Sequence, residues 1–226
     1  MIRNMLHNLI KLIGVTYGAL ILIAVLFTKP LMYPIRKASY QDSADIIKLK
    51  TAQKHLLSAL YLKAKSTTQN PPYVLLYSHG NAEDLGTAST YLHQFTQKGF
   101  SLISYDYSGY GTSTGHPSEL NTYHDIEAVY QYLTQTLKIP PSRIIAYGRS
   151  LGTGPTLELA QHHTLAGVII EGGFINAFRV ITHFPVLPFS PYQNLDKIAI
   201  RMATPFAIWF LITDCSDWYT LSEIST

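Results

Sequence analysis

A serine between two glycines is the first arrangement in this sequence that could carry chemistry. Gly148, Ser150 and Gly152 form a G-x-S-x-G motif between an apolar run, residues 143–147, and a helical pattern that starts near Leu151. A tight turn from a strand into a helix holds its serine at a strained backbone angle, which requires small neighbours. The motif therefore predicts a nucleophile, Ser150, with the Leu151 N–H as donor to the developing oxyanion. A glycine-rich turn with an incidental serine is the alternative.

A second oxyanion donor is expected after an earlier strand. The apolar run 73–78 is followed directly by His79, Gly80 and Asn81. Gly80 lets the backbone approach closely, which leaves the Asn81 N–H as the natural second donor. His79 could act as a general base, but we expect it to brace this loop.

Short apolar runs alternate with helical patterns from residue 73 onward. The expected strands cover 73–78, 100–107, 143–148 and 166–172, and the expected helices end near Lys98 and cover 124–137 and 151–162. This alternation predicts an α/β fold, a mostly parallel sheet with helices on both faces. Before it, residues 45–50 and 55–63 are predicted to form paired strands.

Three segments carry a family resemblance. They read YSHGNAEDLG at 77–86, SYDYSGYGTSTGHPSE at 104–119 and IIAYGRSLGTGPTLELA at 144–160. The sequence resembles the alpha/beta-hydrolase superfamily from about residue 31 to 205. It is most similar to membrane-associated alpha/beta-hydrolase domain-containing serine hydrolases, a group that includes protein depalmitoylases. The resemblance implies hydrolysis of an ester or thioester, hence an esterase or thioesterase acting on a small acyl ester or an acylated protein.

The resemblance also implies a catalytic triad in the order Ser, acid, His. In the family the acid lies nine positions after a proline that precedes a strand, which from Pro205 gives Asp214. Asp217 is the weaker alternative, and both could be incidental surface acids. The last histidine of the sequence is His183, so none follows Asp214. We therefore expect impaired turnover, unless His79, His116 or His183 serves as a substitute base.

The C-terminal part departs from the family pattern. Residues 172–200 are rich in Phe, Val, Leu and Pro, which suits either a lid over Ser150 that accepts an acyl chain or a packing connection. Beyond residue 205 the resemblance ends. We expect the last strand and helix of the fold to be missing, through a frameshift, a truncation or divergence, which would leave an expected strand at 206–212 as an apolar edge.

The N-terminus predicts a membrane anchor over residues 1–30, followed by the hydrolase domain over 31–226. Residues 12–28 lack any charge and would form a helix of about 26 Å, close to the about 30 Å of a hydrocarbon core. No small-residue cleavage site follows, which favours a retained single-pass anchor over a signal peptide or a buried core helix. Lysine and arginine flank the run on both sides, so its orientation stays open.

Composition excludes several other classes of protein. Hydrophobic residues make up 47% and charged residues 14%, which argues against disorder. The single cysteine, Cys215, excludes a disulfide scaffold and a cysteine-ligated zinc site, and the net charge of +3 has no basic cluster suited to nucleic acid. The glycine-rich loop 108–115 lacks a lysine for phosphate binding, so it is not expected to bind a phosphate group. No cofactor or metal is expected. The remaining alternatives are a non-catalytic remnant or binding protein and a serine peptidase of the same fold.

Overall fold

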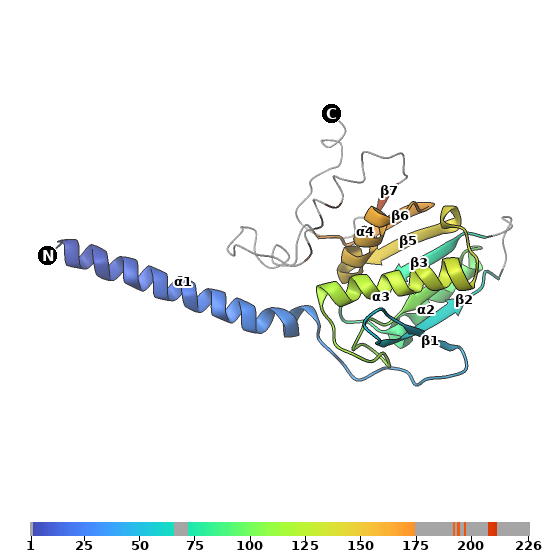
Figure 1. The fold of residues 1–226 in the computed structure, drawn as a ribbon, viewed down its shortest axis with the longest axis horizontal. Helices are drawn as coiled ribbons and strands as arrows, with labels where there is room; N and C mark the ends of the chain where they lie inside the picture. The colour runs from blue at the N-terminus through green and yellow to red at the C-terminus, as the bar shows by residue number, and fades with distance from the viewer. Residues whose placement is uncertain are drawn as a thin grey trace, which may run out of the picture.

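The chain forms a seven-stranded mixed sheet in a computed structural model that describes residues 2–65, 72–174, 192, 194, 197 and 208–211 (Figure 1). The strand order is β1-β2-β4-β3-β5-β6-β7. The strands are β1 Ile46–Lys50, β2 Leu56–Leu62, β3 Val74–Ser78, β4 Ser101–Tyr105, β5 Ile144–Arg149, β6 Gly167–Glu171 and β7 Ile208–Leu211. Strands β4, β3, β5, β6 and β7 pair in parallel, whereas β1 and β2 add an antiparallel hairpin at one edge. The predicted mostly parallel sheet is confirmed.

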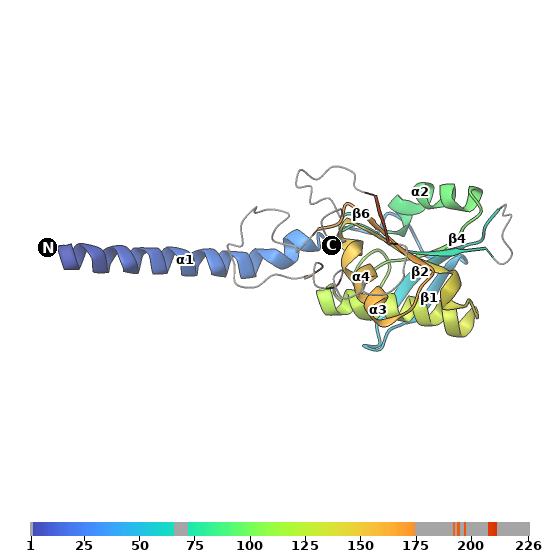
Figure 2. The same cartoon turned by 90° about the horizontal axis from the view of Figure 1, so that it is seen from above.

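Helices cover both faces of this sheet. They are α2 Leu85–Gln97, α3 Glu119–Gln131 and α4 Thr153–His162. Figure 2 shows α2 on one face and α3 with α4 on the other. Alternate residues of one strand serve the two layers: Leu75 packs with Leu92 of α2, and Leu76 belongs to the core that includes Ile126 of α3. Strands that are apolar on both faces therefore follow from burial under two helical layers.

The N-terminal helix α1, Ile2–Met32, extends away from the sheet (Figures 1 and 2). It covers nearly all of the predicted anchor, residues 1–30, and extends beyond the uncharged run 12–28 at both ends. It is the one helix in the described residues that is long and apolar enough to cross a membrane. At about 1.5 Å per residue its 31 residues extend about 46 Å, more than the hydrocarbon core requires.

Two helices begin differently from the sequence-based expectation. Helix α3 starts at Glu119 rather than near residue 124, because the Ser118 hydroxyl caps it by accepting the Asn121 N–H at 3.1 Å. It runs into a π-helical turn, Tyr132–Thr136. Before α4, the residues Ser150–Gly152 form a 3-10 turn, so the α-helix itself begins at Thr153.

Most of the C-terminal expectations lie outside the described residues. This applies to Asp214, Asp217, His183 and nearly all of the expected lid at 172–200. The expected strand at 206–212 is present as β7, which pairs in parallel with β6 from Val168↔Ile208 to Glu171↔Leu211.

Candidate active site

Ser150 lies where β5 ends and the turn into α4 begins. Its φ of +49° is a left-handed conformation that a serine rarely adopts, and its side chain is exposed. A Cβ on Gly148 would lie 2.5 Å from the Gly152 carbonyl oxygen, and a Cβ on Gly152 would lie 2.0 Å from the Ser78 carbonyl oxygen. Both flanking positions therefore accept only glycine without a backbone shift. Strain and crowding together are what a nucleophile elbow requires.

The loop after β3 lies beside this turn because β3 and β5 are parallel neighbours. Ser78 is paired with Gly148 across the two strands. The three residues that follow Ser78 therefore run alongside Arg149 and the turn. A Cβ built on Gly80 would lie 3.8 Å from the Ser150 Cβ, which places the two predicted oxyanion segments at one point.

Both predicted donor amides are free for a ligand within the described part of the chain. The Asn81 N–H has no hydrogen-bond partner there. Leu151 is the second residue of the 3-10 turn, so its N–H precedes the first hydrogen bond of the turn. Thr153 stabilises the turn by donating its hydroxyl to the Ser150 carbonyl at 2.7 Å. Two unpaired amides next to an exposed serine can stabilise an oxyanion on a carbonyl that the serine attacks.

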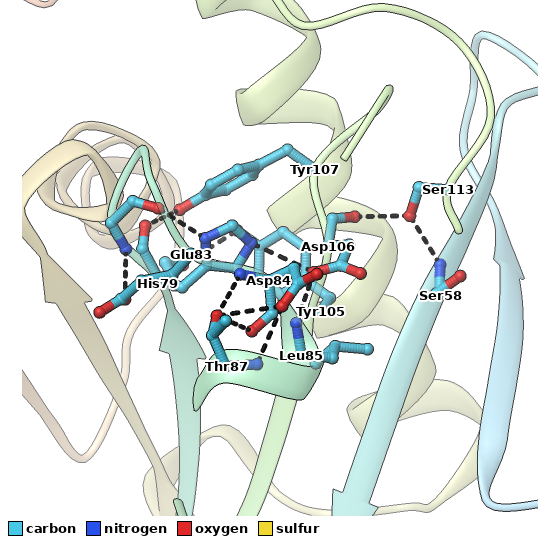
Figure 3. A network of polar contacts seen from close by, with 12 residues as sticks. Ser58, His79, Glu83, Asp84, Leu85, Thr87, Tyr105, Asp106, Tyr107 and Ser113 are labelled. Atoms are coloured by element: carbon cyan, nitrogen blue, oxygen red, sulfur yellow. Dashed lines mark hydrogen bonds and ion pairs between the residues drawn. The ribbon is translucent and has the colours of Figure 1, made fainter. Parts of the chain in front are cut away.

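His79 is fully buried beneath this loop (Figure 3). Its Nδ1 donates to the Gly80 carbonyl at 2.8 Å, and its Nε2 faces Asp106 Oδ1 at 3.4 Å. The Tyr107 hydroxyl donates to the His79 carbonyl at 2.6 Å, and the two rings pack 4.4 Å apart. Both ring nitrogens are directed at loop and core atoms, so His79 braces the Gly80–Asn81 segment from below.

Asp106 is a buried carboxylate that the sequence analysis did not single out. It accepts the Leu85 N–H at 2.9 Å and the Tyr40 hydroxyl at 2.5 Å, in addition to facing His79 (Figure 3). It therefore links the start of α2, the N-terminal segment and the oxyanion loop. Its place directly after β4, at the carboxyl edge of a parallel sheet, was the signal that could have found it.

Glu83 and Arg149 were also missed, and they flank Ser150. Glu83 Oε2 accepts the Gly80 N–H at 3.0 Å, and its Oε1 lies 2.5 Å from Arg149 Nη1. Arg149 Nε lies 3.5 Å from Glu171 Oε1 at the end of β6. An unpaired carboxylate next to an oxyanion would destabilise that oxyanion by charge repulsion. The ion pair with the Arg149 guanidinium offsets the charge of Glu83.

A second polar cluster has the residue types of a catalytic triad: His55, Ser108 and Asp125. Its hydrogen bonds differ from those of a triad, because the serine bonds directly to the aspartate. The Ser108 hydroxyl is buried and donates to Asp125 Oδ1 at 2.7 Å, while His55 Nδ1 lies 2.9 Å from the same hydroxyl. Burial raises the pKa of Asp125 to about 7. This serine is neither exposed nor strained, so the group holds the loop after β4 in place.

Ser150 has no activating base among the described residues. The eight histidines in this part of the chain make no hydrogen bond to its hydroxyl, and His116 packs against His55 at the far end of the loop after β4. The described residues also contain no group of three metal-ligating side chains. What they provide is a strained serine and two donors.

Comparison with known proteins agrees with this geometry. A family model described as serine aminopeptidase, S33, matches residues 69–208, more than half of the chain. Alpha/beta hydrolase domain-containing protein 17C of Homo sapiens is 37% identical over 172 residues, covering 74% of this chain and 50% of that protein. The corresponding protein 17B of Homo sapiens is 35% identical over 173 residues, covering 74% and 58%. The chain thus spans about half the length of the curated relatives it matches.

Solved structures share the fold at low sequence identity. An alpha-beta hydrolase from Vibrio vulnificus has a TM-score of 0.57 and 23% identity, covering 74% of this chain and 63% of that one. The esterase Pf2001 from Pyrococcus furiosus has a TM-score of 0.60 and 13% identity, covering 79% and 76%. At these identities the similarity concerns the arrangement of strands and helices alone.

Proposed function

Because the chain belongs to the serine aminopeptidase S33 family and has the alpha/beta-hydrolase fold, we propose that it is a membrane-anchored serine hydrolase of acyl esters or thioesters. Ser150 is the nucleophile of this proposal. The observation that carries it is the positive φ of an exposed serine between two crowded glycines, beside a second loop with a free amide. A serine in an ordinary turn has no reason to carry that strain.

The proposed reaction has two steps. The Ser150 Oγ attacks the acyl carbon, its proton passes to the leaving alcohol or thiol, and the acyl group stays on Oγ. Water then attacks the same carbon, which releases the carboxylic acid and returns the proton to Ser150. The Leu151 and Asn81 N–H groups donate to the carbonyl oxygen while it is negative in each step. Removing one such donor typically costs about 10²- to 10³-fold in kcat.

Acyl substrates are favoured by two features of the sequence. Residues 172–200, which follow β6 in the chain, are rich in Phe, Val, Leu and Pro and poor in charge. Helix α1 would hold the hydrolase domain at a membrane, where acyl chains are abundant. Both features suit a long apolar group better than a charged metabolite.

The proposal is tested with a fluorophosphonate probe, which reacts with activated serines. Because no histidine among the described residues contacts Ser150, the serine should react with the probe slowly. It would lack the rate enhancement of about 10⁴- to 10⁶-fold that a complete triad contributes. Ser150→Ala should abolish this labelling. The matched control is Ser142→Ala, because Ser142 is exposed in the 3-10 turn Pro141–Arg143 at the opposite end of β5.

Three outcomes would change the proposal. Labelling that survives Ser150→Ala would remove Ser150 as nucleophile. A chain that never labels would favour the non-catalytic binding protein over the enzyme. Rapid labelling would show that a histidine has been recruited as base, and His183→Ala and His79→Ala would then identify it.

A peptidase is the second candidate, because the matching family model is described as a serine aminopeptidase. The same elbow would then attack an amide, which is a poorer electrophile than an ester or thioester. Comparing p-nitrophenyl acyl esters, acyl thioesters and aminoacyl p-nitroanilides separates the two. Turnover of the anilides alone would favour the peptidase.

A further inference from the structure

We propose that the sheet edge carrying Ser150 is docked on an anionic bilayer surface, so that the site faces the membrane rather than the solvent. This rests on the proposed function through its membrane anchor. It goes further, because an anchor alone would allow the domain to tumble on a loose linker.

The end of α1 is attached to the neighbourhood of Ser150 by buried contacts. Tyr33 follows α1 directly, continues it through an N–H to Lys29 carbonyl bond of 2.9 Å, and is buried. Its hydroxyl lies 2.9 Å from that of Tyr192. A Cβ on Gly154 would lie 2.2 Å from the Tyr192 ring, so Tyr192 packs on the first turn of α4, just beyond Ser150. Both overall views place the end of α1 beside α4 and the start of α3 (Figures 1 and 2).

The exposed large hydrophobic side chains outside α1 gather at this same edge. In the described residues they are Ile35, Leu56 and Leu120, with 60%, 43% and 62% of the residue exposed. Leu120 lies in the first turn of α3, two residues from Thr122, whose hydroxyl lies 3.0 Å from that of Tyr192. Leu56 begins β2, which runs antiparallel to β4, so it projects beyond the end of β4. Single exposed hydrophobic residues scattered over a surface are common, whereas a group of them at one edge indicates an interaction site.

Basic side chains accompany these hydrophobic ones. Arg36 and Lys37 are exposed directly after Ile35. Lys50 is exposed at the end of β1, where it pairs with Leu56, and Lys54 is exposed in the hairpin turn that follows. We call these seven residues the edge patch: Ile35, Arg36, Lys37, Lys50, Lys54, Leu56 and Leu120. Exposed hydrophobic groups with surrounding cations match an interface of acyl chains and anionic headgroups. Each basic residue near such a surface contributes about 1 kcal/mol, which is about a fivefold shift toward the docked state.

Docking in this orientation has a consequence for the substrate. The Ser150 turn and the edge patch lie at the same edge, so the acyl chain of a membrane-bound ester or thioester can reach Ser150 from the bilayer without crossing bulk water. An acyl group on a lipid or on a membrane-attached protein fits this geometry better than a soluble ester.

The test is a depth measurement on the full chain. Cys215→Ser removes the native thiol, and single cysteines at Leu120, at Gln97 and at Val15 then carry an environment-sensitive fluorophore. Gln97 is the matched control, because it is exposed at the end of α2 on the opposite edge. In vesicles of phosphatidylcholine with phosphatidylserine, spin-labelled lipids should quench the Leu120 and Val15 labels and leave the Gln97 label unaffected.

The contribution of charge to docking is tested by changing the lipid, the salt concentration or the basic side chains. Vesicles of phosphatidylcholine alone, high salt, or the double substitution Arg36→Gln with Lys37→Gln should each weaken quenching at Leu120 and leave Val15 unchanged. A Leu120 label quenched no more than the Gln97 label would overturn the docked orientation. A Val15 label that is not quenched would overturn the anchor together with it. Because no readout uses catalysis, failure of Ser150 as a nucleophile would appear only in the fluorophosphonate experiment.

Discussion

Arg149 Nη1 lies 2.5 Å from Glu83 Oε1, which joins the residue before the candidate nucleophile to the loop of the second oxyanion donor. The other oxygen of Glu83 accepts the Gly80 N–H at 3.0 Å. The two halves of the candidate oxyanion site are therefore held in register by one carboxylate. Arg149 occupies a variable position of the G-x-S-x-G motif, and Glu83 lies two residues after Asn81.

Glu83→Ala should slow fluorophosphonate labelling of Ser150 by about 10- to 100-fold, because a displacement of about 1 Å in a catalytic group has effects of that size. Glu83→Gln retains an oxygen that accepts the Gly80 N–H and should recover most of the rate. Glu158→Ala is the control, because Glu158 lies on α4 and forms ion pairs with His162 and with Lys197. Equal rates in Glu83→Ala and the unmodified chain would contradict this role.

Gly152→Ala should lower the free energy of unfolding by about 1 to 3 kcal/mol or more, the usual cost of overpacking. The added Cβ would lie 2.0 Å from the Ser78 carbonyl, and backbone atoms must move to admit it. Denaturant unfolding followed by circular dichroism measures the change. Gly18→Ala serves as the control, because its Cβ meets no atom within 4 Å. Similar stability of the two variants would show that the turn is less crowded than the structure indicates.

Asp125 should make stability depend on pH. Burial raises its pKa in the folded chain from 3.8 to about 7, so the folded state binds this proton more tightly than the unfolded state does. Its contribution to the free energy of unfolding is therefore largest at low pH and is lost as the pH rises from about 4 to about 7. The full loss is about 4 kcal/mol.

Asp125→Asn should remove this pH dependence, because the amide does not titrate and can still bond to Ser108. The difference in unfolding free energy between the two proteins, measured at several pH values, isolates the carboxyl from all other groups. A difference that stays constant between pH 4 and 7, or that grows in favour of the unmodified chain as the pH rises, would contradict the assignment.

Tyr33→Phe should reduce the free energy of unfolding by about 0.5 to 1.5 kcal/mol, the net contribution of a typical buried hydrogen bond. The loss should fall in the lower part of this range, because the Tyr192 hydroxyl retains its contact with Thr122 at 3.0 Å. Denaturant unfolding of Tyr33→Phe beside the unmodified chain measures the loss. A Tyr33→Phe variant as stable as the unmodified chain would mean that the hydroxyl pair contributes nothing.

Local sequence was sufficient to predict the layers of the fold and the position of Ser150. Strands β3 to β6 are apolar runs separated by helical patterns, and this periodicity is a property of neighbouring residues. The elbow could be recognised because its requirement, glycine on both sides of a strained serine, is met within five residues. The start of α3 was predicted less accurately, because it depends on a single cap. The Ser118 hydroxyl starts this helix before its apolar pattern begins.

Sequence alone thus determined the alpha/beta architecture, the nucleophile candidate, its two donor amides and the apolar N-terminal helix. Only the tertiary structure decided that His79 turns to Asp106, that Glu83 reaches Arg149 and that Tyr33 meets Tyr192. These partners are 27, 66 and 159 positions apart, and the pairing of parallel strands and packed helices, not the pattern around either residue, brings them together. The residues of the Ser150 turn are neighbours in the sequence, so a short segment is enough to predict its chemistry. The orientation of the charged side chains around the turn depends on which strand ends become neighbours in the sheet.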